Sequence, residues 1–317
     1  MTPDDVTLSL QDLAAPGSYP DWPMAFVDLG KEARDAPGFR LPPYPVIGLG
    51  PCDHPLAARL DACLEPRFTP EALLAAARDQ PSAAAVVTQL LRILDHLPDE
   101  EALVAESLAY AVLQGSDAHR RWIAARPEHA ALRDGRVTLA RERDILTVTL
   151  DRPEAGNAID RTMRDALHEA FALANVDRTI ERVRLRAGGR SFSLGADLSE
   201  FGTTTDPATA HAIRCVTLPA REALMCADRM EVRIDGACIG AGLELAACAA
   251  RITASPRAWF QLPELAMGIL PGAGGCVSLS RRIGRQRTLL MVLSGRRLGA
   301  REALAWGLVD ALVDDPT

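Results

Sequence analysis

A change of hydrophobic periodicity near residue 135 is the feature that most constrains the fold of this chain. From about 55 to 127, apolar residues recur at the spacing of an α-helix. The clearest run consists of Val86, Leu90, Ile93, Leu94 and Leu97. After Gly135 the period becomes two, and 143–150 alternates as a half-buried strand does. The pattern therefore predicts an α/β core that follows an α-helical region.

Residues 1–135 are expected to form an irregular leader and a helical extension. Prolines and glycines interrupt every candidate helix or central strand before residue 50. Helices are predicted over 55–65, 70–79, 82–97, 99–114 and 117–126. Ser82 is the expected N-cap of the third of these helices. Tyr110, His119 and Trp122 are interpreted as packing residues.

Residues 136–317 are expected to form the α/β unit. Its strands are predicted at 143–150, 181–187, 229–235 and 250–255. Helices are predicted at 160–175, 207–227, 240–249, 272–282, 285–294 and 300–306. This alternation of strand and helix is typical of an α/β fold.

Charge and composition exclude several classes of function. The net charge is −7 and the pI is about 5.5, without a basic stripe, so no nucleic-acid partner is expected. Lys31 is the only lysine, which leaves Schiff-base chemistry almost without a candidate nucleophile. The acidic start precedes no apolar segment, and no later stretch approaches the length of a membrane span. A soluble, cytoplasmic protein without a membrane partner is expected.

The seven cysteines show neither a C-x-x-C pair nor a spacing suited to zinc. Most of them are expected to be reduced, buried and small, and no metal site is expected. Cys238 and Cys276 lie near the segments described next, but nearness alone does not make them nucleophiles.

The first segment with a chemical pattern covers 188–198. Its glycines follow a predicted strand and let the backbone turn sharply and approach a ligand. The amide of Ala196 is the one best placed to point into a pocket. The alternative is an ordinary glycine-rich turn in which Asp197 caps the following turn.

The second segment places Gly240 and Gly242 on either side of Ala241, at the start of an apolar helix. The free amides and the dipole of a helix start favour an oxyanion. Glu244 lies three residues after Ala241 and therefore on the same helical face. Glutamate is rarely buried unless it is paired or functional. The alternative to a catalytic role for Glu244 is a structural ion pair with an arginine.

The third segment contains Glu264 directly after Pro263, followed by the glycine-rich stretch 272–275. A glutamate in a first helical turn can act simply by complementing the helix dipole. The stretch lacks the lysine of a phosphate-binding loop and the βαβ context of a dinucleotide site, so a nucleotide enzyme is a poor interpretation. Two carboxylates near oxyanion-binding amides suit a reaction in which one activates water and the other delivers a proton.

The order and spacing of the three segments resemble those of the crotonase family, the enoyl-CoA hydratases and isomerases. The resemblance covers about 136–313 and includes 150–158 and 300–309. It implies a spiral of ββα turns, an oxyanion hole formed by the amides of Ala196 and Ala241, and an acyl-CoA thioester as substrate, with no cofactor besides the coenzyme A of that substrate. The substrate contacts that it implies are Ala155, Asn157, Ala158, Leu194, Gly195, Asp197, Leu198, Gly240, Pro271 and Gly272.

By the same resemblance, Glu244 and Glu264 match the two acid/base positions of the hydratases. The hypothesis is a syn addition of water to a trans-2-enoyl-CoA, in which Glu264 protonates C2 and Glu244 orients or activates the water. Because two close carboxylates do not easily both ionise, one is expected to stay protonated near neutral pH. Isomerisation, thioester hydrolysis, cofactor-independent dioxygenation and non-catalytic acyl-CoA binding remain open alternatives.

Two departures from the family pattern concern the ends of the resemblance. The printed sequence ends soon after 300–309, so the terminal helical segment that in the family closes the pocket and joins subunits is expected to be missing. A helical region of some 130 residues stands before the core, and it is expected to supply the lid or the assembly contacts instead. The resemblance implies a homo-oligomer, a trimer or a hexamer.

Overall fold

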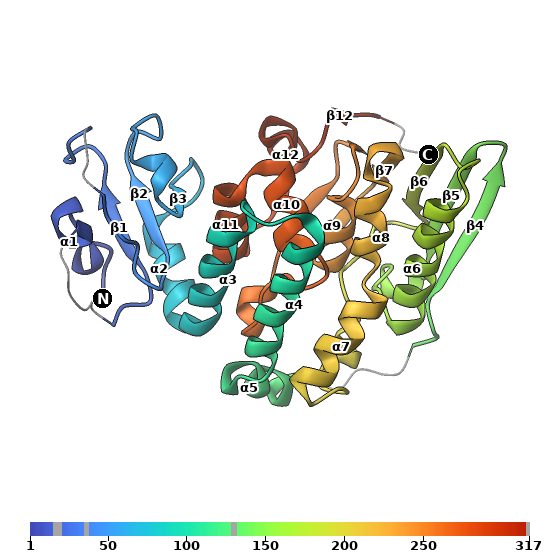
Figure 1. Cartoon of the computed structure of the whole chain (residues 1–317), viewed down its shortest axis with the longest axis horizontal. Coiled ribbons are helices and arrows are strands. Elements are labelled where there is room, and N and C mark those ends of the chain that lie inside the picture. Colours follow the sequence, from blue (N-terminus) through green and yellow to red (C-terminus); the bar gives the residue numbers. More distant parts are fainter. Residues whose placement is uncertain (15–20, 35–37, 128–131, 315–317) are drawn as a thin grey trace.

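A parallel sheet organises the second half of the molecule in the computed structural model (Figure 1). The structure describes residues 1–14, 21–34, 38–127 and 132–314. The order of strands in this six-stranded sheet is β12-β9-β7-β6-β5-β4, and all neighbours are parallel except β4 and β5. The strands are β4 (Arg136–Glu142), β5 (Ile145–Asp151), β6 (Arg182–Ala187), β7 (Met230–Ile234), β9 (Arg251–Ala254) and β12 (Ala311–Leu312).

A smaller sheet carries the segments with the chemical patterns. It has the order β11-β10-β8, and its members are β8 (Ala237–Ile239), β10 (Trp259–Gln261) and β11 (Leu298–Gly299). These strands are too short to show a period of two, which explains why sequence reasoning missed them. Strands β7 and β8 follow each other along the chain but belong to different sheets. Cys238 of β8 makes an isolated parallel bridge to Ser193, in the segment that follows β6.

The helices that follow the strands agree closely with the predicted ranges, with one exception. The predicted helix 207–227 is two helices, because Pro219 ends the first and begins the second. The observed helices are α6 (Arg161–Val176), α7 (Pro207–Thr217), α8 (Pro219–Met225), α9 (Ala241–Ala246), α10 (Gly275–Ile283), α11 (Arg285–Ser294) and α12 (Ala300–Trp306). Short 3-10 turns are η3 (Pro153–Ala155), η4 (Leu198–Glu200), η5 (Ala227–Arg229) and η6 (Glu264–Met267).

The leader is not wholly irregular, and that expectation is wrong for three of its segments. Strands β1 (Ala25–Asp28), β2 (Val46–Leu49) and β3 (Ala62–Cys63) form a parallel sheet. Each of the first two has three buried residues followed by a half-buried one, so they lack the alternation by which strands are recognised. Helix α1 (Leu10–Ala14) and the turns η1 (Asp4–Val6) and η2 (Ala57–Arg59) accompany this sheet. The predicted helix at 55–65 is therefore wrong.

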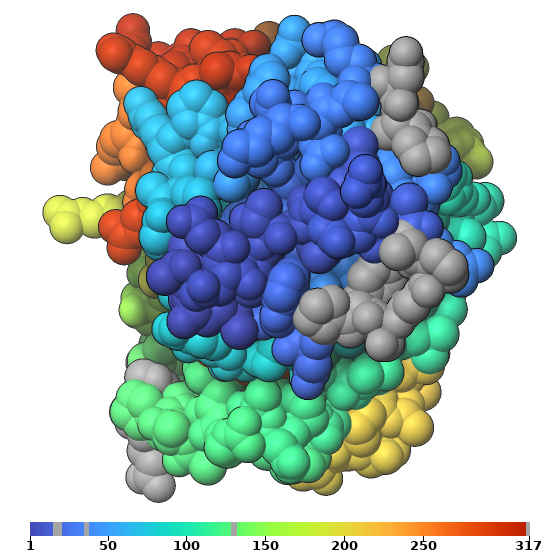
Figure 2. Space-filling model, turned by 90° about the vertical axis from the view of Figure 1, so that its left-hand side faces the viewer, coloured from blue at the N-terminus to red at the C-terminus, as the bar shows by residue number. Residues whose placement is uncertain are grey.

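Four helices connect the leader to the α/β part: α2 (Pro70–Asp79), α3 (Pro81–Leu94), α4 (Asp99–Gln114) and α5 (Asp117–Ala125). Ser82 is not the N-cap of α3, because Pro81 occupies the first helical position and Gln80 precedes it. Figure 1 shows these helices between the leader sheet and the large sheet, and Figure 2 shows the leader spread over the end of the molecule.

A continuous hydrophobic core joins the helical region to the α/β part. It contains Leu73, Leu91 and Leu103 from the helices together with Phe192 and Leu290 from the second half, all almost fully buried. The leader sheet and its helix enclose a separate, smaller core. Because the large core crosses residue 135, the boundary predicted there does not separate two independent hydrophobic cores.

One cysteine pair departs from the expected reduced state. Cys52 forms a disulfide with Cys63 of β3, whereas the other five cysteines are free, in agreement with the expectation that most are reduced. Among the described helices, none combines the length and the apolar character needed to cross a bilayer.

Candidate active site

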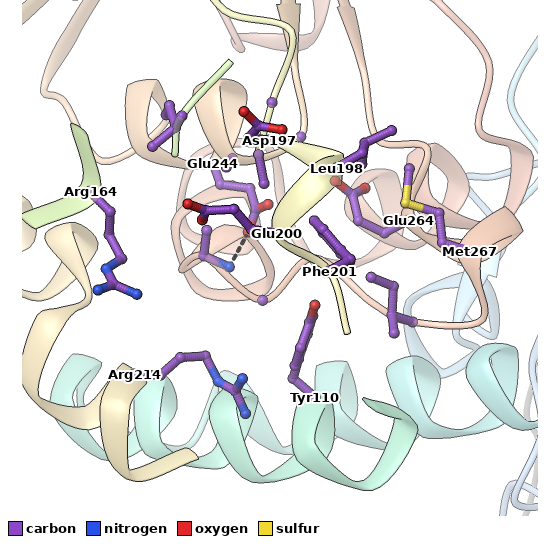
Figure 3. Close-up of a pocket in the computed structure, with 18 of the residues that line it drawn as sticks. Tyr110, Arg164, Asp197, Leu198, Glu200, Phe201, Arg214, Glu244, Glu264 and Met267 are labelled. Atoms are coloured by element: carbon purple, nitrogen blue, oxygen red, sulfur yellow. Dashed lines mark hydrogen bonds between the residues drawn. The ribbon is translucent and has the colours of Figure 1, made fainter. Parts of the chain in front are cut away.

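The site is a pocket of about 760 Å³ between α4 and the segments around β8 and β10. Ala196, Ala241, Glu244 and Glu264 all line it, so the structure brings together the residues that the three sequence segments singled out. Figure 3 shows Glu244 and Glu264 on one side of the pocket and Tyr110 of α4 on the other, with its hydroxyl directed inward.

Two backbone amides are available to a ligand in this pocket. The 193–197 segment makes an isolated parallel bridge in which Ile159 donates to Gly195 and Asp197 donates to Ile159. In such a ladder the intervening residue, Ala196, points its N–H the other way. Ala241 is the first residue of α9, so no helical carbonyl lies within reach of its N–H. Among the described residues, neither N–H has a protein acceptor.

Glu244 is held by backbone amides of the loop that follows η6. Its Oε2 accepts hydrogen bonds from the N–H of Ala273 at 2.7 Å and from that of Gly275 at 2.9 Å. The side chain is buried, and no arginine pairs with it among the described residues. The structural ion pair considered as an alternative is therefore not what explains this glutamate.

Glu264 is the less satisfied of the two carboxyl groups. It is buried, and its Oε2 has no hydrogen-bond partner among the described residues. Its Oε1 lies against the backbone of Gly240, where a Cβ would fall only 2.6 Å away. Gly240 also has a φ of +46°, so only glycine fits this turn without strain. A buried oxygen without a hydrogen-bond partner destabilises the folded state, and a catalytic role is one explanation for such an atom.

The electrostatics of the site favour a protonated carboxyl group. Burial raises the pKa of Glu244 to about 7, against the effect of the Ala273 and Gly275 amides. Burial and the nearby charge of Glu244 raise the pKa of Glu264 well above its ordinary value. One glutamate is thus poised near neutral pH while the other holds its proton.

Six of the ten predicted substrate contacts line the pocket: Leu194, Gly195, Asp197, Leu198, Gly240 and Gly272. Asp197 also accepts from Ser199 and pairs with Arg152 at 2.7 Å, so its capping role and its place in the pocket coexist. Burial disfavours the charged form of Asp197, whereas hydrogen bonds from Ser199 and Arg152 favour it. The hydrogen bonds outweigh burial, so the pKa of Asp197 is lowered.

The other four predicted contacts do not line this pocket: Ala155, Asn157, Ala158 and Pro271. A substrate contact at these positions stays a prediction. Asn157 has a clear structural role instead, because its side-chain amide donates to the carbonyls of Gly188 and Ser191 and its Oδ1 accepts from the N–H of Arg152. It fixes the segment that presents Ala196.

Sequence reasoning missed the contribution of α4 to the site. Tyr110 and Gln114 line the pocket, and Tyr110 lies under the guanidinium of Arg214, 4.5 Å from its ring centre. Arg214 donates to Ser107 and to Gln114. The interpretation of Tyr110 as a packing residue is therefore incomplete. The same is true of His119, which also lines the pocket and whose Nδ1 lies 2.8 Å from the carbonyl oxygen of Met267. Trp122 stacks on His119, as a packing residue does.

A signal for α4 was present in the sequence. Glu106, Tyr110 and Gln114 are spaced four apart and form a polar stripe along one face of the helix. Exposed apolar residues of the same helix, Leu108 and Val112, blur the contrast between its two faces, so the stripe did not stand out.

The comparisons with known proteins identify the fold and the family. The fold is that of a crotonase-type protein. An enoyl-CoA hydratase from Mycobacterium smegmatis superimposes with a TM-score of 0.52 at 30% identity, covering 57% of this chain and 70% of that one. The family model for enoyl-CoA hydratase/isomerase matches residues 140–316. The chain belongs to this family.

The similar curated proteins match the same half of the chain. A mevalonyl-coenzyme A hydratase from Beauveria bassiana is 32% identical over 179 residues, covering 54% of this chain and 64% of the relative. A 2,3-dehydroadipyl-CoA hydratase from Escherichia coli is 33% identical over 171 residues, covering 54% of this chain and 66% of the relative. The chain thus spans just under two thirds of the length of these two relatives, and the family match begins after α4 and α5.

Proposed function

We propose that this protein adds water across the double bond of a trans-2-enoyl-CoA thioester. The observation that carries the proposal is the meeting of four groups in one pocket: the free N–H groups of Ala196 and Ala241 and the buried carboxyl groups of Glu244 and Glu264. Family membership supports an acyl-CoA substrate. The two relatives described above are named as hydratases of CoA esters.

The amides of Ala196 and Ala241 would bind the thioester oxygen. Water addition places negative charge on that oxygen in the transition state, and preorganised N–H donors at a helix start stabilise it. The polarised carbonyl in turn makes C3 electrophilic. Both N–H groups can bind the thioester oxygen only if no protein acceptor already occupies them.

The two carboxyl groups would divide the proton transfers. The water oxygen forms a bond to C3 as a water proton passes to Glu244, and Glu264 gives its proton to C2. The proton on Glu244 then replaces the one that Glu264 lost, so the net change is the addition of H and OH. Glu264, whose pKa is raised well above its ordinary value, suits the acid, and Glu244, with a pKa of about 7, suits the base.

The test is an assay of the purified protein with trans-2-enoyl-CoA esters of several chain lengths, following the loss of the conjugated thioester absorbance. Glu244→Gln and Glu264→Gln should each lower kcat by about 10²–10⁴-fold, the range of general acid–base catalysis. Glu169→Gln is the matched control, because Glu169 is an exposed glutamate of α6. Unchanged rates in both site variants would refute the two-carboxylate mechanism.

The alternatives predict other outcomes of the same experiment. Movement of the double bond without hydration would indicate an isomerase, and release of free CoA a thioesterase. Oxygen uptake with an aryl-acetyl-CoA would indicate a cofactor-independent dioxygenase. Thioester binding without any turnover would favour a binding protein.

A further inference from the structure

Successive N–H groups of one loop point alternately to two different glutamates. Ala273 and Gly275 donate to Glu244, whereas Gly274 donates to Oε1 of Glu106 at 2.7 Å. Two further donors to Glu106 follow at the start of α10: Cys276 at 2.8 Å and Val277 at 3.3 Å. The same five-residue backbone therefore holds a carboxylate on each of its two sides.

The second glutamate comes from the helical region. Glu106 is almost fully buried in the middle of α4, which lies outside the part of the chain that matches the family. It is separated by 168 residues from the loop that it binds. These hydrogen bonds therefore connect the helical region to the α/β core at the loop that holds Glu244.

We propose that Glu106 is a positioning residue of the active site, which acts by fixing the loop whose N–H groups orient Glu244. This inference rests on the hydration reaction proposed above. It gives the helical region a role beyond covering the core, because the geometry of Glu244 then depends on α4.

A simple helix cap does not account for this glutamate. A serine or asparagine side chain satisfies a helix start without a charge. A third carboxyl group close to two other buried ones instead adds desolvation and repulsion, which three N–H donors and the helix dipole offset only in part. Burial and the charge of Glu244 raise the pKa of Glu106 well above its ordinary value despite those donors. Such an arrangement is retained at a cost in stability, as is common at functional sites.

The charge of Glu106 also affects Glu264, the proposed acid. It contributes to raising the pKa of Glu264, after burial and the charge of Glu244. Burial lowers the pKa of the Arg214 guanidinium of α7, and the charges of Tyr110 and Glu106 act against this effect. The titratable and charged groups that face Glu106 are Glu244, Glu264, Arg214, Cys248 and Cys276.

The experiment compares Glu106→Gln with Glu101→Gln in the full chain. Glu101 lies on the same helix but is exposed, so the control removes an equal charge from α4 without touching the loop. Two measurements are made on each variant. The first is amide hydrogen exchange in 268–280, and the second is kcat and KM for a trans-2-enoyl-CoA ester as a function of pH.

Glu106→Gln should accelerate exchange in this loop, including the amides that donate to Glu244. It should also lower kcat by roughly 10–100-fold with a smaller change in KM, because small misplacements of catalytic groups are this costly. Loss of the Glu106 charge lowers the pKa of Glu264, so the fall of activity at high pH should move to lower pH. Glu101→Gln should behave as the unmodified protein does.

The hydrogen exchange separates this inference from the proposed reaction. If the natural protein is inactive but Glu106→Gln loosens the loop, hydration is refuted, whereas Glu106 is still shown to fix the loop that holds Glu244. An unchanged loop, or an unchanged kcat and pH profile in an active enzyme, would overturn the positioning role. Loss of kcat without a change in loop exchange or pH profile would likewise overturn it.

Discussion

The ring of Tyr110 occupies the space that a side chain at position 272 would need. A Cβ placed on Gly272 falls 2.1 Å from Cδ2 of Tyr110, although the backbone of Gly272 has no left-handed conformation. Gly272 directly precedes Ala273, whose N–H holds Glu244. The close contact therefore seats α4 against the loop that carries one wall of the pocket.

Gly272→Ala should destabilise the protein by about 1–3 kcal/mol, the usual cost of overpacking. It should also lower activity, because the displaced loop carries the Ala273 amide. Tyr110→Ala removes the clashing ring, so the double variant should recover part of the loss, as a double-mutant cycle by chemical denaturation would show. Gly299→Ala is the control, since no atom lies within 4 Å of a Cβ there. Additive effects of the two substitutions would contradict the steric explanation.

The buried carboxyl groups should make stability fall as the pH rises. A glutamate whose pKa is higher in the folded state favours folding while it is protonated, and this contribution is lost as the pH passes through the folded-state value. For Glu244, whose pKa rises from 4.5 to about 7, the loss between pH 4 and pH 8 is on the order of 3 kcal/mol of unfolding free energy.

Urea denaturation at several pH values, compared between the natural protein and Glu244→Gln, would isolate this contribution. The comparison is needed because His119, whose pKa is lowered mainly by burial, changes stability in the opposite direction. The variant should gain stability relative to the natural protein as the pH rises. A constant difference between the two proteins across this range would show that the pKa of Glu244 is not raised.

Much of the α/β part could be predicted from sequence because its long strands and helices carry clear periods. The glycine-rich turns and the two glutamates at fixed spacing also indicated the pocket, and the structure places Ala196, Ala241, Glu244 and Glu264 around it. These signals are local, since each depends on residues within one turn or one strand of each other.

The parts that escaped prediction depend on contacts between distant segments. No local pattern shows that Glu106 meets a loop 168 residues later or that Tyr110 lies against Gly272. The leader strands were missed because a buried parallel strand has no period of two, and β1 and β2 are each only four residues long. In this chain, tertiary contacts decide the role of the helical region.

Arg92→Met should destabilise the protein by about 3–5 kcal/mol, the cost of removing one partner from a buried ion pair. Arg92 of α3 donates from Nε and Nη2 to both oxygens of Asp61, at 2.7 Å each, and also binds the carbonyls of Pro42 and Tyr44. Asp61 is 1% exposed, so its charge would be left unpaired.

Chemical denaturation of the Arg92→Met protein would measure this loss, and limited proteolysis would show whether the leader sheet detaches first. Arg78→Met is the matched control, because Arg78 is exposed and makes a long ion pair, 3.9 Å, with the neighbouring Asp79. A surface ion pair of this kind contributes about 0–1 kcal/mol to stability. Equal stabilities of the two variants would mean that this ion pair does not hold the leader sheet in place.

Residues 136–317 should not fold alone into a stable protein. Their core continues into the helical region through residues such as Leu91 and Leu103, so removing 1–135 would expose a large apolar surface and leave the loop at Gly274 without Glu106. The isolated part should aggregate or bind a hydrophobic dye, and its co-expression with 1–135 should restore a soluble complex if the missing surface is the cause. A soluble, cooperatively melting 136–317 with the activity of the full chain would contradict this, and would show that the helices are dispensable for both the fold and the site.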